Sequence, residues 1–239
     1  MKKLEEDPKT YESKFTQLTK GVNLEAQEWI LSKIKSDQSI LEIGCGTGAL
    51  AHKIALKGNE VIGIDKNSQM VEFASTHYQK QNEKKLVYQI GSIEDLPVES
   101  KTQDIVISTF MLSELRPFEQ QILLRNAWKA LKKGGRIIIA AEFTPSGIWK
   151  LKFRLKRWRY KRKLQRLTLP PTQIPEHFYK YIKHIGFKII DERRWKHGAI
   201  RAIELKKTKR GDIKGPDKEG VTEQSPGYYR PEPVKFQGL

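Results

Sequence analysis

The sequence is almost without cysteine, since Cys45 is the single one among 239 residues. One thiol excludes an intramolecular disulfide framework and favours a reducing compartment. Long apolar runs are also missing, because no stretch approaches the roughly 18 residues that cross a bilayer. Residues 1–7 are mostly charged and lack the apolar core of a secretory signal. We therefore expect a cytoplasmic protein.

Metal-ligand spacing is absent as well. The five histidines are scattered at positions 52, 77, 177, 184 and 197, so the sequence predicts no metal site. We find no internal repeat, and the length favours one domain with additions.

Negative charge is scarce in one region. No Asp or Glu stands between Glu142 and Glu176, whereas residues 150–166 hold ten Lys or Arg. These ten supply more than half of the formal net charge of +17. Such an excess points to an anionic partner, either a nucleic acid or a lipid surface.

A glycine-rich turn is the most informative feature that is present. Residues 41–48 (LEIGCGTG) lie between a short apolar run and a helix-like run. Glycines at 44, 46 and 48 permit a tight turn at positive φ and close approach of a ligand. The N-terminus of the following helix would offer free N–H groups to that ligand. This pattern is typical of a nucleotide-binding turn in a Rossmann-like fold.

Asp65 follows Gly48 by seventeen positions, at the end of the apolar run 61–64. An acidic residue at this distance is placed to accept hydrogen bonds from the two hydroxyls of a ribose. The alternative is that Asp65 only caps the next helix.

Short apolar runs alternate with helical patterns along the first two thirds of the chain. This order predicts a parallel sheet built from right-handed βαβ units. Two further runs, at 187–190 and 200–205, are close enough in sequence to form a hairpin. We expect core strands at 40–43, 61–64, 86–90, 104–108 and 136–141, and helices at 24–34, 49–56, 68–80, 119–131 and 175–185.

The glycine turn, with Glu42 before it, resembles the acidic-x-G-x-G-x-G motif of class I S-adenosylmethionine-dependent methyltransferases. Three later segments resemble that family in the same order: 91–97 (GSIEDLP), 104–115 (DIVISTFMLSEL) and 131–136 (LKKGGR). Within this family, the sequence resembles the branch that contains methyltransferase type 11 and the ubiquinone and menaquinone biosynthesis methyltransferases. The resemblance implies a Rossmann-like α/β fold with a mostly parallel seven-stranded sheet, a C-terminal antiparallel hairpin, and S-adenosylmethionine as cofactor.

The resemblance also implies a set of site residues. Ser92 stands where the family has an acidic residue against the adenine amino group, and Tyr11 lies in a segment that folds over the cofactor in the family. The expected cofactor-binding residues are Tyr11, Glu42, Gly44, Cys45, Gly46, Gly48, Asp65, Lys66, Met70, Ser92, Ile93 and Thr109.

Methyl transfer to a weakly acidic nucleophile would need a general base. We take Glu114 and Glu142 as the catalytic candidates, with Tyr11 and His197 also expected near the mouth of the site. The alternative is that Glu114 has no catalytic role and is a solvated carboxylate at the start of a helix.

The basic segment 149–167 interleaves aromatic and aliphatic residues with its cations. Three interpretations stay open: a lid helix with solvated Lys and Arg, an interfacial helix on an anionic membrane, and a phosphate-binding segment for RNA. The first two are compatible with each other.

We therefore expect a methyltransferase acting on a small or lipid-like acceptor, as a peripheral protein if the basic segment binds a membrane. The alternatives are an RNA methyltransferase that uses residues 150–166 and a non-catalytic binding module. The expected organisation is an N-terminal lid or helical segment at 1–38, a methyltransferase domain at 39–205 with a basic aromatic insertion at 146–170, and a disordered tail at 206–239.

Overall fold

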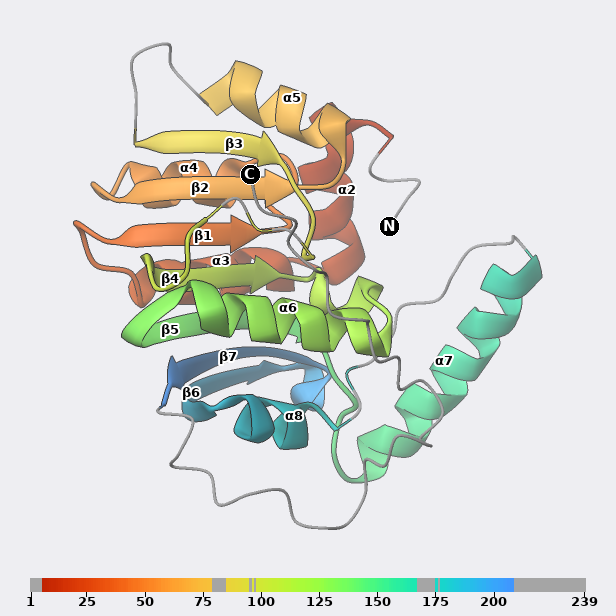
Figure 1. Cartoon of the computed structure of the whole chain (residues 1–239). Helices are drawn as coiled ribbons and strands as arrows, with labels where there is room; N and C mark the ends of the chain where they lie inside the picture. The colour runs from red at the N-terminus through yellow and green to blue at the C-terminus, as the bar shows by residue number, and fades with distance from the viewer. Residues whose placement is uncertain are drawn as a thin grey trace, which may run out of the picture.

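The computed structural model describes residues 6–78, 85–94, 96, 98–166, 175 and 177–208, with the backbone alone for 159–166. Its centre is one seven-stranded sheet (Figure 1). The strands are β1 (Ser39–Ile43), β2 (Glu60–Asp65), β3 (Leu86–Ile90), β4 (Gln103–Thr109), β5 (Leu131–Glu142), β6 (Phe187–Trp195) and β7 (Ile200–Lys207).

The strand order is β3-β2-β1-β4-β5-β7-β6. β1 to β5 run parallel, whereas β7 pairs antiparallel with both β5 and β6. The predicted fold class, including the terminal hairpin, is confirmed. The order reverses between β1 and β4, and ligands of open α/β sheets bind beyond the carboxyl ends of the strands at such a point.

Helices cover both faces of the sheet, and alternate strand residues supply the two cores. One core holds Ile105 and Ile107 of β4 and lies under α3 (Val22–Ser32), α4 (Ala49–Ala55) and α5 (Ser68–Tyr78). The other holds Val106 and lies under α6 (Pro117–Ala130) and α8 (Phe178–Ile185).

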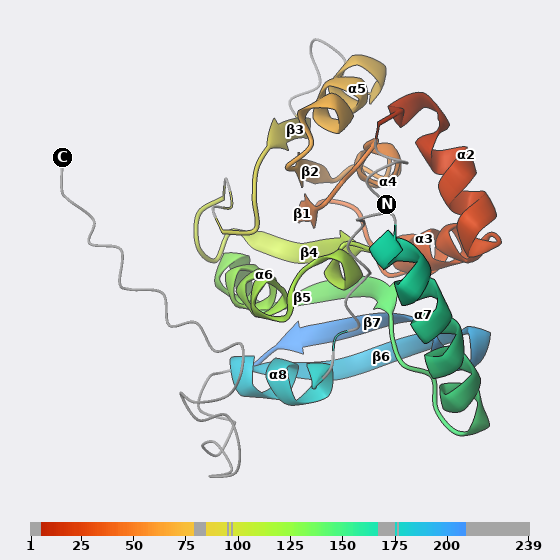
Figure 2. The same ribbon diagram turned by 90° about the vertical axis from the view of Figure 1, so that its right-hand side faces the viewer.

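The N-terminal helix α2 (Pro8–Thr19) has no counterpart among the helices that the sequence predicted. It is mostly polar, and its buried residues are Phe15 and Thr19. A helix with so few apolar residues resembles a polar loop in the sequence, which is the physical reason why the pattern did not indicate it. Figure 2 shows α2 beside α3 and α4, on the edge where the strands end.

The basic segment forms α7 (Ile148–Arg166), which lies beyond the carboxyl ends of the strands (Figures 1 and 2). Across the part of the chain that is described, no helix is both long and apolar enough to cross a membrane.

Several boundaries differ from the prediction, most of all in β5, β6 and β7. β5 begins at Leu131 rather than at residue 136, because Leu131 pairs with Gln103 before a shift in register. β6 continues from Ile190 to Trp195, because an edge strand pairs through its backbone and needs no continuous apolar run. β7 continues to Lys207, two residues into the expected tail. The remainder of that tail, 209–239, lies outside the described residues.

Candidate active site

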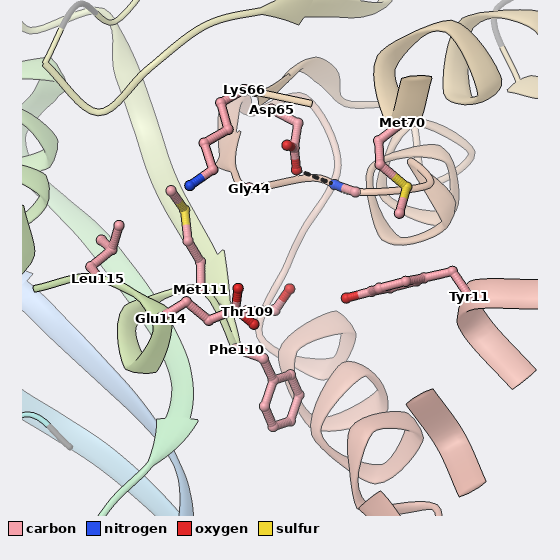
Figure 3. A pocket seen from close by; sticks show the side chains of 11 residues that line it. Tyr11, Gly44, Asp65, Lys66, Met70, Thr109, Phe110, Met111, Glu114 and Leu115 are labelled. Atoms are coloured by element: carbon pink, nitrogen blue, oxygen red, sulfur yellow. Dashed lines mark hydrogen bonds between the residues drawn. The ribbon is translucent and has the colours of Figure 1, made fainter. Parts of the chain in front are cut away.

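A pocket opens at the carboxyl ends of β1, β2 and β4, beside the reversal point of the strand order. It encloses about 580 Å³, counting the part open to solvent. In Figure 3, Tyr11 reaches in from one side, and Met111, Glu114 and Leu115 lie opposite. The lining residues are Tyr11, Gly44, Gly46, Asp65, Lys66, Met70, Thr109, Phe110, Met111, Glu114 and Leu115.

The glycine turn has the backbone that the sequence predicted. Gly44, Gly46 and Gly48 have φ values of +76°, +52° and +81°. A Cβ on Gly48 would lie 2.7 Å from the ring of Tyr88 and from Cβ of Ala74, so this glycine allows close packing. A Cβ on Gly46 would meet nothing within 4 Å. The space beside Gly46 is therefore open to a ligand.

Asp65 lies at the end of β2 and is fixed by two backbone groups. Its Oδ2 accepts a hydrogen bond from the Gly46 N–H at 2.9 Å (Figure 3). Its Oδ1 accepts one from the Asn67 N–H at 2.9 Å. Each carboxylate oxygen has further lone pairs, so the group can also accept from a ligand. Asp65 thus ties the glycine turn to the start of α5 and lines the pocket.

Glu42 is fully buried behind the glycine turn. Desolvation, followed by repulsion from Glu12 and Asp65, raises the pKa of its carboxyl from 4.5 to about 8. Its Oε2 has no hydrogen-bond partner among the described residues. Three carboxyl groups therefore gather at this end of the sheet, an arrangement that favours a positively charged ligand.

Helix α2 closes one side of the site. The Thr47 hydroxyl, within the glycine turn, donates a hydrogen bond to Oε1 of Glu12 at 2.5 Å. Tyr11 stacks on Phe15 with ring centres 5.7 Å apart, and Phe15 packs edge-on against Phe110 at 5.1 Å. These contacts hold Tyr11 at the pocket.

Phe110, directly after β4, adopts a φ of +58°. A bulky side chain is rarely found in this left-handed region, and such strain is concentrated at functional sites. The strained position is held by the Phe110 N–H, which donates to the Ala140 carbonyl at 2.6 Å. The turn directs the chain into the short helix η1 (Leu112–Glu114), which carries Glu114 to the pocket.

The structure gathers eight of the expected site residues around the pocket and places the others elsewhere. Cys45 is buried, and burial raises the pKa of its thiol, which keeps it protonated. Ile93 belongs to the core, and its carbonyl accepts from Asn126 at 2.7 Å. Glu42 and Gly48 lie behind the turn, and Ser92 is half-buried outside the lining.

Glu142 ends β5, outside the pocket lining. Its carboxylate accepts a hydrogen bond from Arg157 of α7 at 3.1 Å, and its N–H donates to the Ser113 hydroxyl at 3.1 Å. His197 stacks on Trp149 of α7, with ring centres 3.9 Å apart.

Sequence reasoning did not single out Glu12, Thr47, Tyr88 or Phe110. Tyr88 stabilises the glycine turn, because its hydroxyl donates a hydrogen bond to the Gly48 carbonyl at 2.7 Å. Thr47 could have been found from its place inside the glycine turn. The other three contact the site across long stretches of sequence, which no local pattern indicates.

A family model described as a methyltransferase domain matches residues 34–176. This range includes the glycine turn, Asp65, Glu114 and Glu142. The chain belongs to the methyltransferase-domain family. Its cofactor is S-adenosylmethionine, in agreement with the resemblance found in the sequence motifs.

Two curated relatives are similar in sequence to about half of this chain. A ubiquinone biosynthesis O-methyltransferase of Rickettsia conorii is 34% identical over 125 residues, which cover 52% of this chain and 42% of the relative. A malonyl-[acyl-carrier protein] O-methyltransferase of Hahella chejuensis is 29% identical over 116 residues, which cover 48% and 40%. The matched region spans less than half the length of each relative.

A solved structure supports the fold. A SAM-dependent methyltransferase of Methanosarcina mazei superposes with a TM-score of 0.59 at 21% identity, covering 75% of this chain and 96% of that one.

The residues of the methyltransferase site fit its cofactor. The open space at Gly46 offers room, and Asp65 offers acceptors for hydroxyl groups. Glu42 lies behind the turn with the pKa of its carboxyl raised to about 8, so a bound cation would favour its ionised form. Within the described ranges, no three His, Cys, Asp or Glu side chains gather in a way that would hold a metal ion.

Proposed function

We propose that this methyltransferase transfers a methyl group from S-adenosylmethionine to a small, lipophilic acceptor, which it reaches at a membrane surface. One observation carries the proposal. The same pocket joins the glycine turn and Asp65 to an apolar side formed by Phe110, Met111 and Leu115.

The cofactor side of the site would be held by groups already fixed in the protein. Asp65 would accept hydrogen bonds from the ribose hydroxyls, and the open space at Gly46 permits close approach. Tyr11 would close the site from α2 (Figure 3). A bound cation would favour the ionised form of the Glu42 carboxyl behind the turn. The bound cofactor supplies a methyl group on a positively charged sulfur, so positioning and desolvation by the protein do most of the work.

The acceptor side is apolar with one carboxylate. Met111, Glu114 and Leu115 lie opposite Tyr11 in Figure 3. Apolar side chains would exclude water from the acceptor, and Glu114 would take the proton that a hydroxyl acceptor loses. One curated relative is named for ubiquinone biosynthesis, which supports a lipophilic acceptor.

RNA is the second candidate acceptor, and the ten cations of residues 150–166 favour it. A non-catalytic module that binds S-adenosylmethionine without methyl transfer is the third possibility. The three differ in where a transferred methyl group would be found.

The experiment is incubation of the purified protein with methyl-labelled S-adenosylmethionine and a cell extract, which is then separated into organic-soluble, RNA and protein fractions. We expect label in the organic phase. Asp65→Ala should abolish it, because the substitution removes acceptor oxygens and frees the Gly46 N–H. Glu28→Ala, on an exposed carboxylate of α3, is the control that should retain the label. Label in RNA would reassign the acceptor, and cofactor binding without label anywhere would favour the non-catalytic module.

A further inference from the structure

We infer that the outer face of α7 is a docking surface for an anionic lipid bilayer. The docking face is the apolar stripe of Ile148, Leu151, Leu155 and Trp158, with the Lys and Arg residues beside it. This inference rests on the proposed function, which explains why the protein would bind a membrane. The evidence for the binding itself is the geometry of α7.

One side of α7 faces the body of the protein. Trp149 stacks on His197 with an angle of 6° between the rings, and Arg157 pairs with Glu142 at 3.1 Å. Phe153 lies between these two on the same side, with the Arg157 guanidinium 5.8 Å from its ring centre. Residues 149, 153 and 157 are spaced by four, so they form one continuous face of the helix.

The opposite side carries the apolar stripe. Ile148, Leu151, Leu155 and Trp158 are separated by three, four and three residues, which places them in one row along the helix. Their exposed fractions are 74%, 74%, 57% and 52%. Four large apolar side chains in a row with half or more of their surface in water mark an interaction site.

The positive charges on both sides of the apolar stripe indicate an anionic partner. Lys150, Lys152, Arg154 and Lys156 are all exposed, and α7 contains no acidic residue. Lysine and arginine beside an apolar stripe extend along it and keep their charges in the headgroup region, where anionic lipids attract them. The aliphatic side chains of Ile148, Leu151 and Leu155 need an apolar phase, which RNA does not offer. An anionic bilayer supplies that phase together with negatively charged headgroups.

The position of α7 links docking to the proposed chemistry. Arg157 holds Glu142, whose N–H donates to Ser113 in η1, and the next residue, Glu114, lines the pocket. In Figures 1 and 2, α7 lies along the same edge of the sheet at which the pocket opens. A bilayer bound to α7 therefore lies beside this edge, where a lipid-soluble acceptor has a short path to the site.

The test is cosedimentation of the full chain with phosphatidylcholine vesicles that contain or lack phosphatidylglycerol. We expect binding only with phosphatidylglycerol, and weaker binding at high salt. Leu151→Ser/Leu155→Ser should weaken vesicle binding at least about tenfold, because it removes apolar contact and leaves every charge in place. The matched control is Leu18→Ser/Leu56→Ser, which removes two leucines with exposed fractions of 63% and 71% from other surfaces and should bind like the unchanged protein.

An unchanged protein that does not bind the anionic vesicles would overturn the inference, and so would equal binding by the Leu151→Ser/Leu155→Ser variant. Binding of an RNA oligonucleotide by both proteins, with no vesicle binding, would assign the cations to phosphates instead. Circular dichroism and cofactor titration of each variant confirm that folding and the site are intact. Vesicle binding needs no turnover, so its failure is distinct from failure of the methyl-transfer assay.

Discussion

At the scale of single residues, the site places two carboxyl groups in opposite situations. Glu42 is buried without a hydrogen-bond partner for its Oε2 among the residues that the structure describes, whereas Glu114 lines the open pocket. Glu42 should affect how the free energy of unfolding depends on pH. Glu114 should affect the rate of methyl transfer.

Glu42→Gln should change how stability depends on pH. The Glu42 carboxyl ionises near pKa 4.5 in the unfolded chain and near 8 in the folded protein. The folded state therefore binds the extra proton between these values, and the free energy of unfolding falls as pH rises from about 4.5 to 8. A neutral amide removes this contribution. Urea unfolding of both proteins across this range should show a shallower fall for Glu42→Gln, and parallel curves would contradict the assignment.

Glu114→Gln should lower the rate of methyl transfer about 100-fold and leave cofactor affinity within a few-fold, because loss of a general base affects the chemical step. Glu142→Gln is the matched control, and its rate should fall less than about tenfold, since Glu142 pairs with Arg157 outside the pocket. The assay is label incorporation into the organic-soluble fraction. Equal losses in the two variants would argue against Glu114 as the base.

The residue scale also shows which site contacts the sequence could predict. The glycine turn and Asp65 belong to local patterns with fixed spacing, so their roles could be expected. Phe110 could not be, because its strained φ depends on a hydrogen bond to Ala140 in the neighbouring strand. The side chain of Ile93 is buried in the core, and the expected contact of its backbone N–H with the cofactor stays a prediction.

At the scale of elements, the covered strands were predicted closely and the exposed elements were not. β4 (Gln103–Thr109) lies within one residue at each end of the expected 104–108, since a central strand covered on both faces is an apolar run. The second half of β6 is charged and lies at the sheet edge, where side chains carry little signal. Helix α2 is polar and is held by few contacts, so only the folded arrangement shows its role.

Glu12→Ala should loosen α2 from the glycine turn, because it removes the acceptor of the Thr47 hydroxyl. We expect faster amide hydrogen exchange across Pro8–Thr19 and cofactor binding weakened by about three- to tenfold. Glu28→Ala, an exposed glutamate of α3, is the control and should leave both quantities unchanged. Unchanged exchange in Glu12→Ala would show that other contacts hold the helix.

At the scale of the whole molecule, one ion pair connects distant parts of the chain. Arg136 of β5 pairs with the buried Glu204 of β7 and donates to the carbonyl of Lys33, at the end of α3, at 3.2 Å. Lys33 in turn pairs with Asp191 of β6. The N-terminal helices are thereby tied to the antiparallel edge of the sheet.

Arg136→Ala should destabilise the protein by about 3 kcal/mol, because it leaves the Glu204 carboxylate buried without its partner. Adding Glu204→Gln should restore most of the loss by removing the uncompensated charge. Urea unfolding of both variants measures the difference. A double variant no more stable than Arg136→Ala would show that the connection to Lys33 matters more than the buried charge.

The strand order has a consequence for synthesis on the ribosome. All residues that line the pocket lie between Tyr11 and Leu115, so they emerge early. β5 follows, yet its second edge is covered by β7, which emerges after every other strand that the structure describes. Until then the nascent chain presents an unpaired, apolar strand edge, the kind of surface that joins to other chains. The cofactor site is thus synthesised before the chain segment that protects its sheet from aggregation.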